Sequence, residues 1–460
     1  MSAEPLVTTG SDFPANGSFT EGSVFRHVLR LSGFLSLGFS FWVFASLLEA
    51  FYLGMLGTEQ LAAVAFTMPV TMLITSMTYG LGIGASSVIA RAIGRGDHGA
   101  SVRLCTHTLL LGWLVVSIVG LIGFCFSKRI FELLGANPEV IAFIDEYMSI
   151  WFLGVPFFAP AMLISSLLRA SGVAAISGLQ LALGPCVQMI LGPFLIFGLW
   201  GIPALGIKGA ALAYIAGRLI AMVAGFYIII FHKRLIVFSL DGIINSWRSI
   251  LHVGLPSMAT SSVAPLASAI ITRLLSGYGP EVVAGFSIGA RAESMVMIVL
   301  MATGSAVAPF VGMNWGAGKY NRVQHALRIV RNLCFWWGGC CCLVMFVFAR
   351  EIVSPINSDS IVVSTAVLYL RIVPISMVFM GLQHAASSTF NALGKPMPSM
   401  TLSMARMALI YLPLAIFLNR IWGYHGILFA TTLTSIIVGL WAWRWVHWFI
   451  DKESQSAGHQ

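Results

Sequence analysis

The sequence predicts an all-α membrane protein in which twelve transmembrane helices form two parallel six-helix repeats around a central cleft. Three observations support this fold class. Of the 460 residues, 58% are hydrophobic and 9% are charged, whereas about a quarter of the residues of a soluble protein are charged. Twelve apolar runs reach the roughly 18 to 20 residues that a helix needs to cross a bilayer. The first half of the chain also aligns with the second.

Short connections separate the predicted spans, so there is no room for a second domain. The second, eighth and tenth runs are long enough to tilt or bend. We expect a disordered cytoplasmic tail over 1–24, an N-terminal lobe over 25–235, a cytoplasmic linker over 236–252, a C-terminal lobe over 253–450 and a cytoplasmic tail over 451–460. The runs are 31–53, 63–90, 104–126, 149–168, 176–200 and 210–231, then 253–275, 282–311, 330–348, 361–388, 399–418 and 426–450.

The formal net charge of +9 predicts an orientation in the membrane. If the N-terminus is cytoplasmic, sixteen Lys and Arg residues lie in inside segments and six lie on the opposite side. Cytoplasmic loops carry the excess of positive charge in membrane proteins, so we expect both termini in the cytoplasm and the protein in the inner (plasma) membrane. Because the cations lie in short loops and not on a soluble basic face, no nucleic-acid partner is expected.

An internal repeat predicts how the helices are grouped. Displacing the sequence by 222 residues pairs Gly57 with Gly279, and the same register also pairs Tyr147 with Tyr369. Each repeat has an even number of spans, so the two enter the membrane from the same side. Two such bundles leave a cleft that rocking exposes to either side in turn, which favours a transporter over a channel. A duplicated structural or receptor protein is the alternative.

Two carboxylates lie where charge is costly. Glu49 is within the first span, about four residues from its outer end, and Glu293 is near the middle of the eighth. A carboxylate in hydrocarbon costs several kcal/mol, so such a residue usually faces the bundle interior and serves an ion or substrate pathway. A structural salt bridge is the alternative for both.

Arginines within the spans are candidates for pairing with these acids or for lining the cleft. Arg218 is the deepest, Arg371 also lies within a span, and Arg406 is close enough to the cytoplasmic end to snorkel. Arg291 is two residues from Glu293, so the two side chains diverge on a helix. We favour pairing with Glu293 over an anion-binding cavity. Six methionines are expected near the cleft, either as a flexible apolar pocket or as plain packing: Met68, Met72, Met77, Met295, Met297 and Met301.

The sequence contains no motif for a metal site, a disulfide framework or a phosphate-binding loop. The seven cysteines form neither a CxxC pair nor a Cys/His ligand pair, so no metal site or disulfide framework is expected. Gly394-Lys395 is followed by Pro396 and lacks the glycine spacing of a phosphate-binding loop. We therefore expect no enzyme, no cofactor and no ATP hydrolysis. An ion gradient remains as the energy source, and a carboxylate that changes protonation with the side of access is the simplest coupling device.

Several motifs resemble those of the multidrug and toxic compound extrusion (MATE) transporters. The segment 49–66, EAFYLGMLGTEQLAAVAF, resembles the first-span signature of this family, and 311–318, VGMNWGAG, resembles a second-half element of it. The resemblance covers about residues 25 to 450. It implies two six-helix lobes that exchange inward protons or sodium for organic cations and other drugs, with Glu49 in the position of the first-lobe acid.

One departure from the family pattern bears on the coupling ion. Family members often carry an Asn and, four residues later, an Asp before a proline in the fifth span, whereas this sequence has Gln188 and Gly192 before Pro193. Gln188 is therefore a candidate coupling-site residue beside Glu49, and protons are favoured over sodium. We predict a monomeric antiporter of cationic or amphipathic small molecules. The alternative is a flippase or an exporter of a lipid-linked or anionic substrate from the same superfamily.

Overall fold

The computed structural model describes residues 19–133, 138–201, 203–237 and 239–457. The N-terminal lobe contains α1 (Val24–Leu56), α2 (Thr58–Gly94), α3 (His98–Leu133), α4 (Pro138–Ala170), α5 (Ala174–Phe197) and α6 (Ile207–Tyr227). The C-terminal lobe contains α7 (Ile243–Leu275), α8 (Pro280–Gly316), α9 (Tyr320–Val347), α10 (Ala349–Val353), α11 (Ser360–Ile372), α12 (Met377–Ala392), α13 (Pro396–Met404), α14 (Leu412–Trp422) and α15 (Tyr424–Ala457). No strand is present in these described ranges, and the predicted all-α fold class is confirmed.

Eleven helical segments of the described chain are long and apolar enough to cross a membrane, and the 33-residue α7 occupies the position of the seventh predicted span. The sixth predicted span ends in a π-helical turn over Ile228–His232, and two other predicted spans are interrupted within their length. The tenth consists of α11 and α12 joined by a 3₁₀ turn at Pro374, and the eleventh consists of α13 and α14 joined by a π-helical segment that ends just before Pro413. Proline lacks the N–H that continues an α-helix, so both breaks have a local cause.

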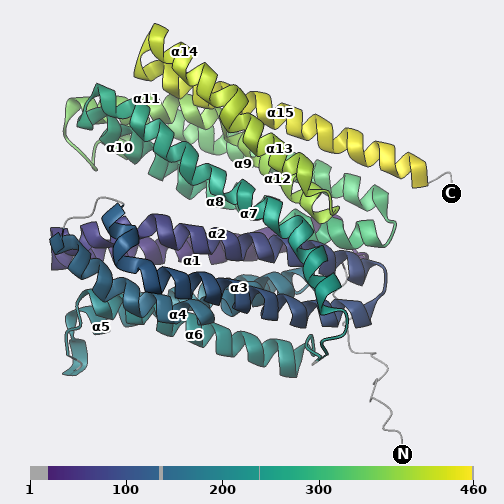
Figure 1. Ribbon diagram of the computed structural model, residues 1–460. Coiled ribbons are helices and arrows are strands. Elements are labelled where there is room, and N and C mark those ends of the chain that lie inside the picture. The colour runs from purple at the N-terminus through teal and green to yellow at the C-terminus, as the bar shows by residue number, and fades with distance from the viewer. Residues whose placement is uncertain (1–18, 134–137, 202, 238, 458–460) are drawn as a thin grey trace, which may run out of the picture.

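The helices form two bundles, as Figure 1 shows. The first helix of each lobe also crosses to the other lobe: α1 packs on α8, and α7 packs on α2. These two contacts are equivalent in the two lobes, as the internal repeat of the sequence leads us to expect. We call the end of the molecule where α1 begins and α15 ends the near end, and the opposite end, which holds α10, the far end. In Figure 1 the two bundles approach each other toward the near end and diverge toward the far end.

Glycines allow the close approach of the lobes at the near end. A Cβ atom on Gly94 would lie 2.1 Å from the carbonyl oxygen of Met313, and one on Gly84 would lie 2.4 Å from that of Ile250. Side chains cross the same interface, since Tyr79 and Ser305 form a 3.2 Å hydrogen bond. Hydrogen bonds of Ser87, Thr106 and Asn314 also join the lobes in this near-end half.

The predicted boundaries of the tails and linker need three corrections. Residues 1–18 of the predicted tail lie outside the described residues. Phe19 is buried, and the carbonyls of residues 19–22 accept hydrogen bonds from the C-terminal lobe, so the tail is not disordered as far as residue 24. The linker ends ten residues earlier than predicted, because α7 begins at Ile243. Helix α15 continues through the predicted C-terminal tail to Ala457. In each case a polar segment, which has no apolar run to predict it, is held by helical or tertiary hydrogen bonds.

Candidate functional site

Glu49 is the centre of a polar cluster inside the N-terminal lobe. Its carboxylate oxygens accept one hydrogen bond from the hydroxyl of Tyr147 at 3.0 Å and one from Nε2 of Gln188 at 3.0 Å. The three residues come from α1, α4 and α5. The structure therefore brings two of the candidate site residues, Glu49 and Gln188, into one cluster. The donors satisfy a carboxylate that lipid would not solvate.

A small cavity adjoins this carboxylate. It has a volume of about 10 Å³, and Glu49, Tyr52, Gln188 and Gly192 are among the residues that line it. Pockets for drug-sized ligands measure about 300–1,000 Å³, whereas one water molecule needs roughly 10–15 Å³. The space beside Glu49 therefore suits a water molecule or a small ion and excludes an organic substrate.

Arg218 lies in the same lobe, on α6. Its guanidinium carbon is 4.7 Å from the ring centroid of Tyr214 and 5.5 Å from that of Phe158, so it is held as a buried cation against aromatic faces. Arg218 interacts electrostatically with Glu49, but the two do not form an ion pair within 4.0 Å among the described contacts. Its Nε atom is buried and has no hydrogen-bond partner in the described chain.

Glu293 has a comparable environment in the C-terminal lobe. It is 8% exposed on α8 and accepts a short hydrogen bond from the hydroxyl of Tyr369 on α11. Its second carboxylate oxygen is buried without a hydrogen-bond partner in the described chain. Glu49 and Glu293 thus belong to two separate clusters, one in each lobe.

The sequence left three span arginines open as partners of Glu293, and the structure distinguishes them. Arg218 is in the other lobe, and the cation that interacts with Glu293 is Arg406. Arg406 does not snorkel to the near end. It donates to Oε1 of Gln383 at 3.1 Å and to Oγ of Ser435 at 3.2 Å inside the lobe. Depth along the helix axis suggested snorkelling, but the direction of the side chain around the axis determines its partners.

The far-end half of α8 lines the cleft between the lobes. Residues three, four or seven positions apart lie on one helix face, so Met301, Ser294 and Arg291 continue the face on which Ser305 and Gly316 contact α2. At the near end this face is packed, but Met301 is 41% exposed, and Ser294 and Arg291 are also exposed. The cleft is therefore open at the far end and closed at the near end.

Helix α2 forms the opposite wall by the same argument. Met72 and Met68 lie seven and eleven residues before Tyr79, and each is 46% exposed. Of the six methionines expected near the cleft, Met68, Met72 and Met301 lie on these faces, whereas Met297 is buried in the core of the C-terminal lobe.

The remaining predicted cation is not in this cleft face. Arg371 is exposed on α11, and its guanidinium carbon lies 5.8 Å from the ring centroid of Phe346 on α9. Arg291 is therefore the sequence-predicted arginine that presents a charge to the cleft, and Arg218 is enclosed within its lobe. No three His, Cys, Asp or Glu side chains of the described residues lie close enough together to hold a metal ion.

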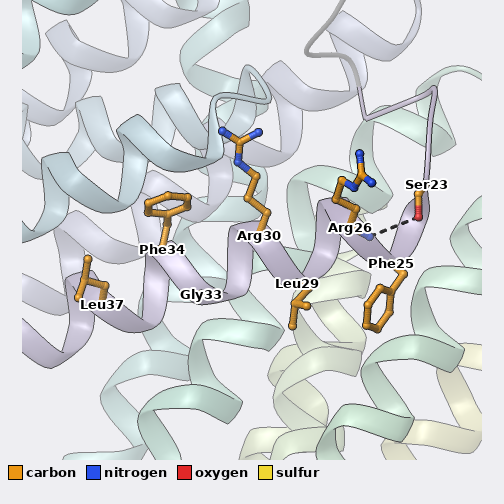
Figure 2. A pocket seen from close by; sticks show the side chains of 8 residues that line it. All are labelled: Ser23, Phe25, Arg26, Leu29, Arg30, Gly33, Phe34 and Leu37. Atoms are coloured by element: carbon orange, nitrogen blue, oxygen red, sulfur yellow. Dashed lines mark hydrogen bonds between the residues drawn. The ribbon is translucent and has the colours of Figure 1, made fainter.

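A larger groove of about 850 Å³ runs along the first turns of α1, far from both glutamates. Arg26, Arg30 and Phe34 project to one side of the helix in Figure 2, and Phe25 and Leu29 project to the other. These residues are mostly apolar with two cations at the near end, as expected for a helix that enters lipid. The groove includes none of the predicted site residues.

Sequence reasoning missed Tyr147 and Tyr369 as hydroxyl donors, although it placed them at equivalent positions of the repeat. That equivalence was the available signal, because a tyrosine hydroxyl in an apolar span requires a partner. No feature of the sequence indicated that Arg406 would donate hydrogen bonds to Gln383 and Ser435.

Comparison with known proteins gives the same assignment. The MatE family profile matches residues 35–194 and 256–417. The chain is 32% identical over 398 residues to the FAD transporter of Shewanella oneidensis, which covers 86% of this chain and 88% of that protein. It is 22% identical over 440 residues to the multidrug export protein MepA of Staphylococcus saprophyticus, covering 94% of this chain and 96% of the relative.

Solved structures agree with the architecture. The bent form of the Vibrio cholerae MATE transporter VcmN superposes with a TM-score of 0.88 at 27% identity and covers 94% of this chain and 98% of that one. An outward-facing multidrug resistance MATE transporter of the MOP superfamily has a TM-score of 0.88 at 21% identity, covering 94% and 97%. Since the family profile covers both repeats, the chain belongs to the MATE family of multi-pass membrane transporters.

Proposed function

We propose that the protein is a secondary active exporter that exchanges an inward ion for a small organic molecule by alternating access, with Glu49 as the coupling carboxylate. The observation that carries this proposal is the cluster of Glu49, Tyr147 and Gln188 beside a cavity of about 10 Å³. A partly buried carboxylate with ion-sized free space can gain and lose a small cation without admitting the substrate.

Because the residues of the cluster come from three helices, protonation of Glu49 can change how these helices pack together. When Glu49 is ionised, it accepts hydrogen bonds from α4 and α5. A protonated carboxyl has one donor and reduced acceptor strength, so protonation changes the balance of contacts that hold α1 to its neighbours. An ion can shift an alternating-access equilibrium only through such a difference between the two states.

Protons are the favoured coupling ion. Hard metal cations prefer several oxygen ligands, but both carboxylate oxygens of Glu49 already accept hydrogen bonds from protein donors. Gly192 adds no side-chain oxygen to the cavity lining. A proton needs no coordination shell, so this donor set suits proton exchange better than sodium exchange.

The charge distribution orients the near end toward the cytoplasm of a bacterial inner membrane, with both termini on that side. The structure is then open to the outside, which is the state in which an exporter releases substrate. We propose that it acts as a monomer.

The substrates are small molecules, and two classes are candidates. The first is the organic cations and amphipathic drugs that fit a cleft lined by methionines such as Met68, Met72 and Met301. The second is an anionic aromatic molecule such as FAD. It is favoured by exposed Arg291, which has no carboxylate within 4.0 Å in the described chain, and by the 32% identity to a protein named FAD transporter.

Transport into and out of proteoliposomes tests both parts of the proposal. Vesicles loaded with ethidium or with FAD, both fluorescent, would receive either a proton gradient or a sodium gradient. We expect proton-driven efflux that Glu49→Gln slows sharply and that Glu59→Gln, the same substitution at an exposed carboxylate at the start of α2, leaves intact. Efflux driven by sodium alone would refute proton coupling, and full activity of Glu49→Gln would refute the role of Glu49.

A further inference from the structure

The segment before α1 is bound to the opposite lobe. Phe19 is 2% exposed, and its ring lies 5.9 Å from that of Phe310 on α8. From this anchor the chain runs to Ser23, whose hydroxyl caps α1 by accepting from the backbone N–H of Arg26 (Figure 2). We call residues 19–23 the N-strap. It is covalently continuous with the first helix of the N-terminal lobe, yet its side-chain anchor lies in the C-terminal lobe.

The polar contacts of the N-strap are made almost entirely to its backbone. Arg322 on α9 donates to the carbonyl oxygens of Phe19 at 2.9 Å, Glu21 at 3.1 Å and Gly22 at 3.0 Å. Lys319 donates to the carbonyl of Thr20 at 3.0 Å. Four consecutive carbonyls are thus bound by two cations, which are the strongest donors that the chain has for neutral acceptors.

Arg322 is itself held in position for this task. Its Nε donates to Oδ1 of Asn314 at 2.9 Å, and the amide of Asn314 donates to the carbonyl oxygens of Phe310 and Phe19 at 2.8 and 3.2 Å. Asn314 is fully buried. This geometry gives a structural role to the asparagine of the VGMNWGAG segment, since it orients the fork of the arginine toward the strap.

The C-terminal lobe has a counterpart ahead of its own first helix. The backbone of Val237 exchanges hydrogen bonds with the hydroxyl of Thr106 on α3, at 3.0 and 3.2 Å. His107 of α3 donates from Nε2 to the carbonyl of Ser239 at 2.8 Å, and its carbonyl accepts from the indole N–H of Trp247 at 3.0 Å. The segment that precedes the first helix of each lobe is therefore hydrogen-bonded to the third helix of the other lobe.

We infer that these two ties form a paired latch that holds the near end closed in the outward-open state. Each tie joins the segment ahead of one lobe's first helix to the other lobe, so these hydrogen bonds of about 3 Å must break if that helix moves away with its own lobe when the near end opens. Breaking them shifts the equilibrium between two discrete arrangements. The inference rests on the alternating access of the proposed function, but not on its coupling ion or substrate.

Hydrogen-exchange mass spectrometry on the full chain in lipid nanodiscs, without substrate or gradient, tests the latch. Arg322→Gln removes most of the donors to the N-strap and should raise the exchange rate about tenfold in peptides covering residues 80–94 of α2 and 305–316 of α8, which the closed near end protects. Arg328→Gln is the matched control, because Arg328 is exposed on the same helix and makes none of the strap contacts. It should leave both peptides unchanged.

A second variant separates the latch from damage to the C-terminal lobe. Phe19→Ala removes the anchor without altering α8 or α9, and it should accelerate exchange in the same α2 and α8 peptides. If either variant accelerates exchange only in residues 19–30, the N-strap is a docked tail and the latch is refuted. Because no transport is measured, that result would leave the proposed export activity standing, whereas failure of export in vesicles would leave this readout unaffected.

Discussion

Tyr147 and Tyr369 occupy the same position in the two repeats, and each donates its hydroxyl to a glutamate of its own lobe. The glutamates do not correspond to each other: Glu49 is on the first helix of its lobe and Glu293 on the second. The tyrosine has thus kept its role on both sides of the duplication, while the acid comes from a different neighbouring helix.

The arginines show the same exchange between helices. In the N-terminal lobe Arg218 of the sixth span lies beside Gly184 of the fifth, and a Cβ on Gly184 would be 3.1 Å from its guanidinium. In the C-terminal lobe the position equivalent to Gly184 is Arg406, which donates to Ser435, the equivalent of Arg218. Each lobe therefore combines an acid, a tyrosine that donates to it and an arginine within a span, although only the tyrosine corresponds.

Glu49 and Tyr147 should be energetically coupled in transport. Tyr147→Phe removes one hydrogen bond to a charged acceptor, worth about 1.5–3 kcal/mol, and should slow export roughly tenfold or more. In Glu49→Gln that bond has lost most of its charge, so adding Tyr147→Phe should have little further effect. Initial efflux rates of the four proteins in a double-mutant cycle measure the coupling. Tyr369→Phe, combined with Glu49→Gln, is the cross-lobe comparison, and additive effects within the Glu49–Tyr147 cycle would exclude the link.

The C-terminal cluster should contribute more to stability than to selectivity. Arg406→Ala removes the cation that interacts with Glu293 and the two hydrogen bonds to Gln383 and Ser435, and each hydrogen bond from a charged donor contributes about 1.5–3 kcal/mol. We expect a melting temperature lower by several degrees, with partial recovery in the double variant Arg406→Ala, Glu293→Gln, because the unpaired charge is then absent. Thermal unfolding in detergent, monitored by size-exclusion chromatography, measures both. Equal destabilisation of the single and double variants would show that Arg406 acts through packing alone.

The fold could be predicted from the sequence because hydropathy and the internal repeat depend only on the order of residues along the chain. The sequence located Glu49, Glu293 and Gln188 within spans for the same reason. The partners of a side chain depend on its direction around the helix axis, which is harder to predict. Arg406 was placed by its depth along the helix and not by this direction, and the sequence could not choose among Arg218, Arg371 and Arg406 as the partner of Glu293. The N-strap could not be predicted at all, since Arg322 and Lys319 bind its backbone carbonyls, and these carry no signal in residue type.

Gly94 should control closure of the near end. Its added Cβ would lie 2.1 Å from the Met313 carbonyl, a backbone atom that cannot rotate away. Gly94→Ala should therefore cost about 1–3 kcal/mol of the closed arrangement and populate the near-end-open state. Alkylation of an Ala90→Cys reporter, which is fully buried in this state, should accelerate about tenfold in a background without the seven native cysteines. Gly33→Ala, at a helical glycine with nothing within 4 Å of the added Cβ, is the control. Equal alkylation rates in the two variants would contradict this role of Gly94.

Arg291 should decide which charge the substrate carries. It is exposed on the face of α8 that lines the open half of the cleft and has no carboxylate within 4.0 Å in the described residues. A guanidinium–phosphate contact is a strong charge-assisted interaction, so Arg291→Gln should raise the KM for FAD about tenfold or more if an anionic molecule is the substrate.

The same substitution should leave the KM for ethidium unchanged or lower it, because a cation gains when a like charge is removed. Arg371→Gln makes an identical charge change outside this face, where the side chain packs over Phe346, and it should alter neither KM. Initial rates of both fluorescent substrates across a concentration series give the comparison. If Arg291→Gln and Arg371→Gln have the same effect on FAD, the charge of Arg291 acts only through the general field of the protein, and the anionic candidate loses its structural support.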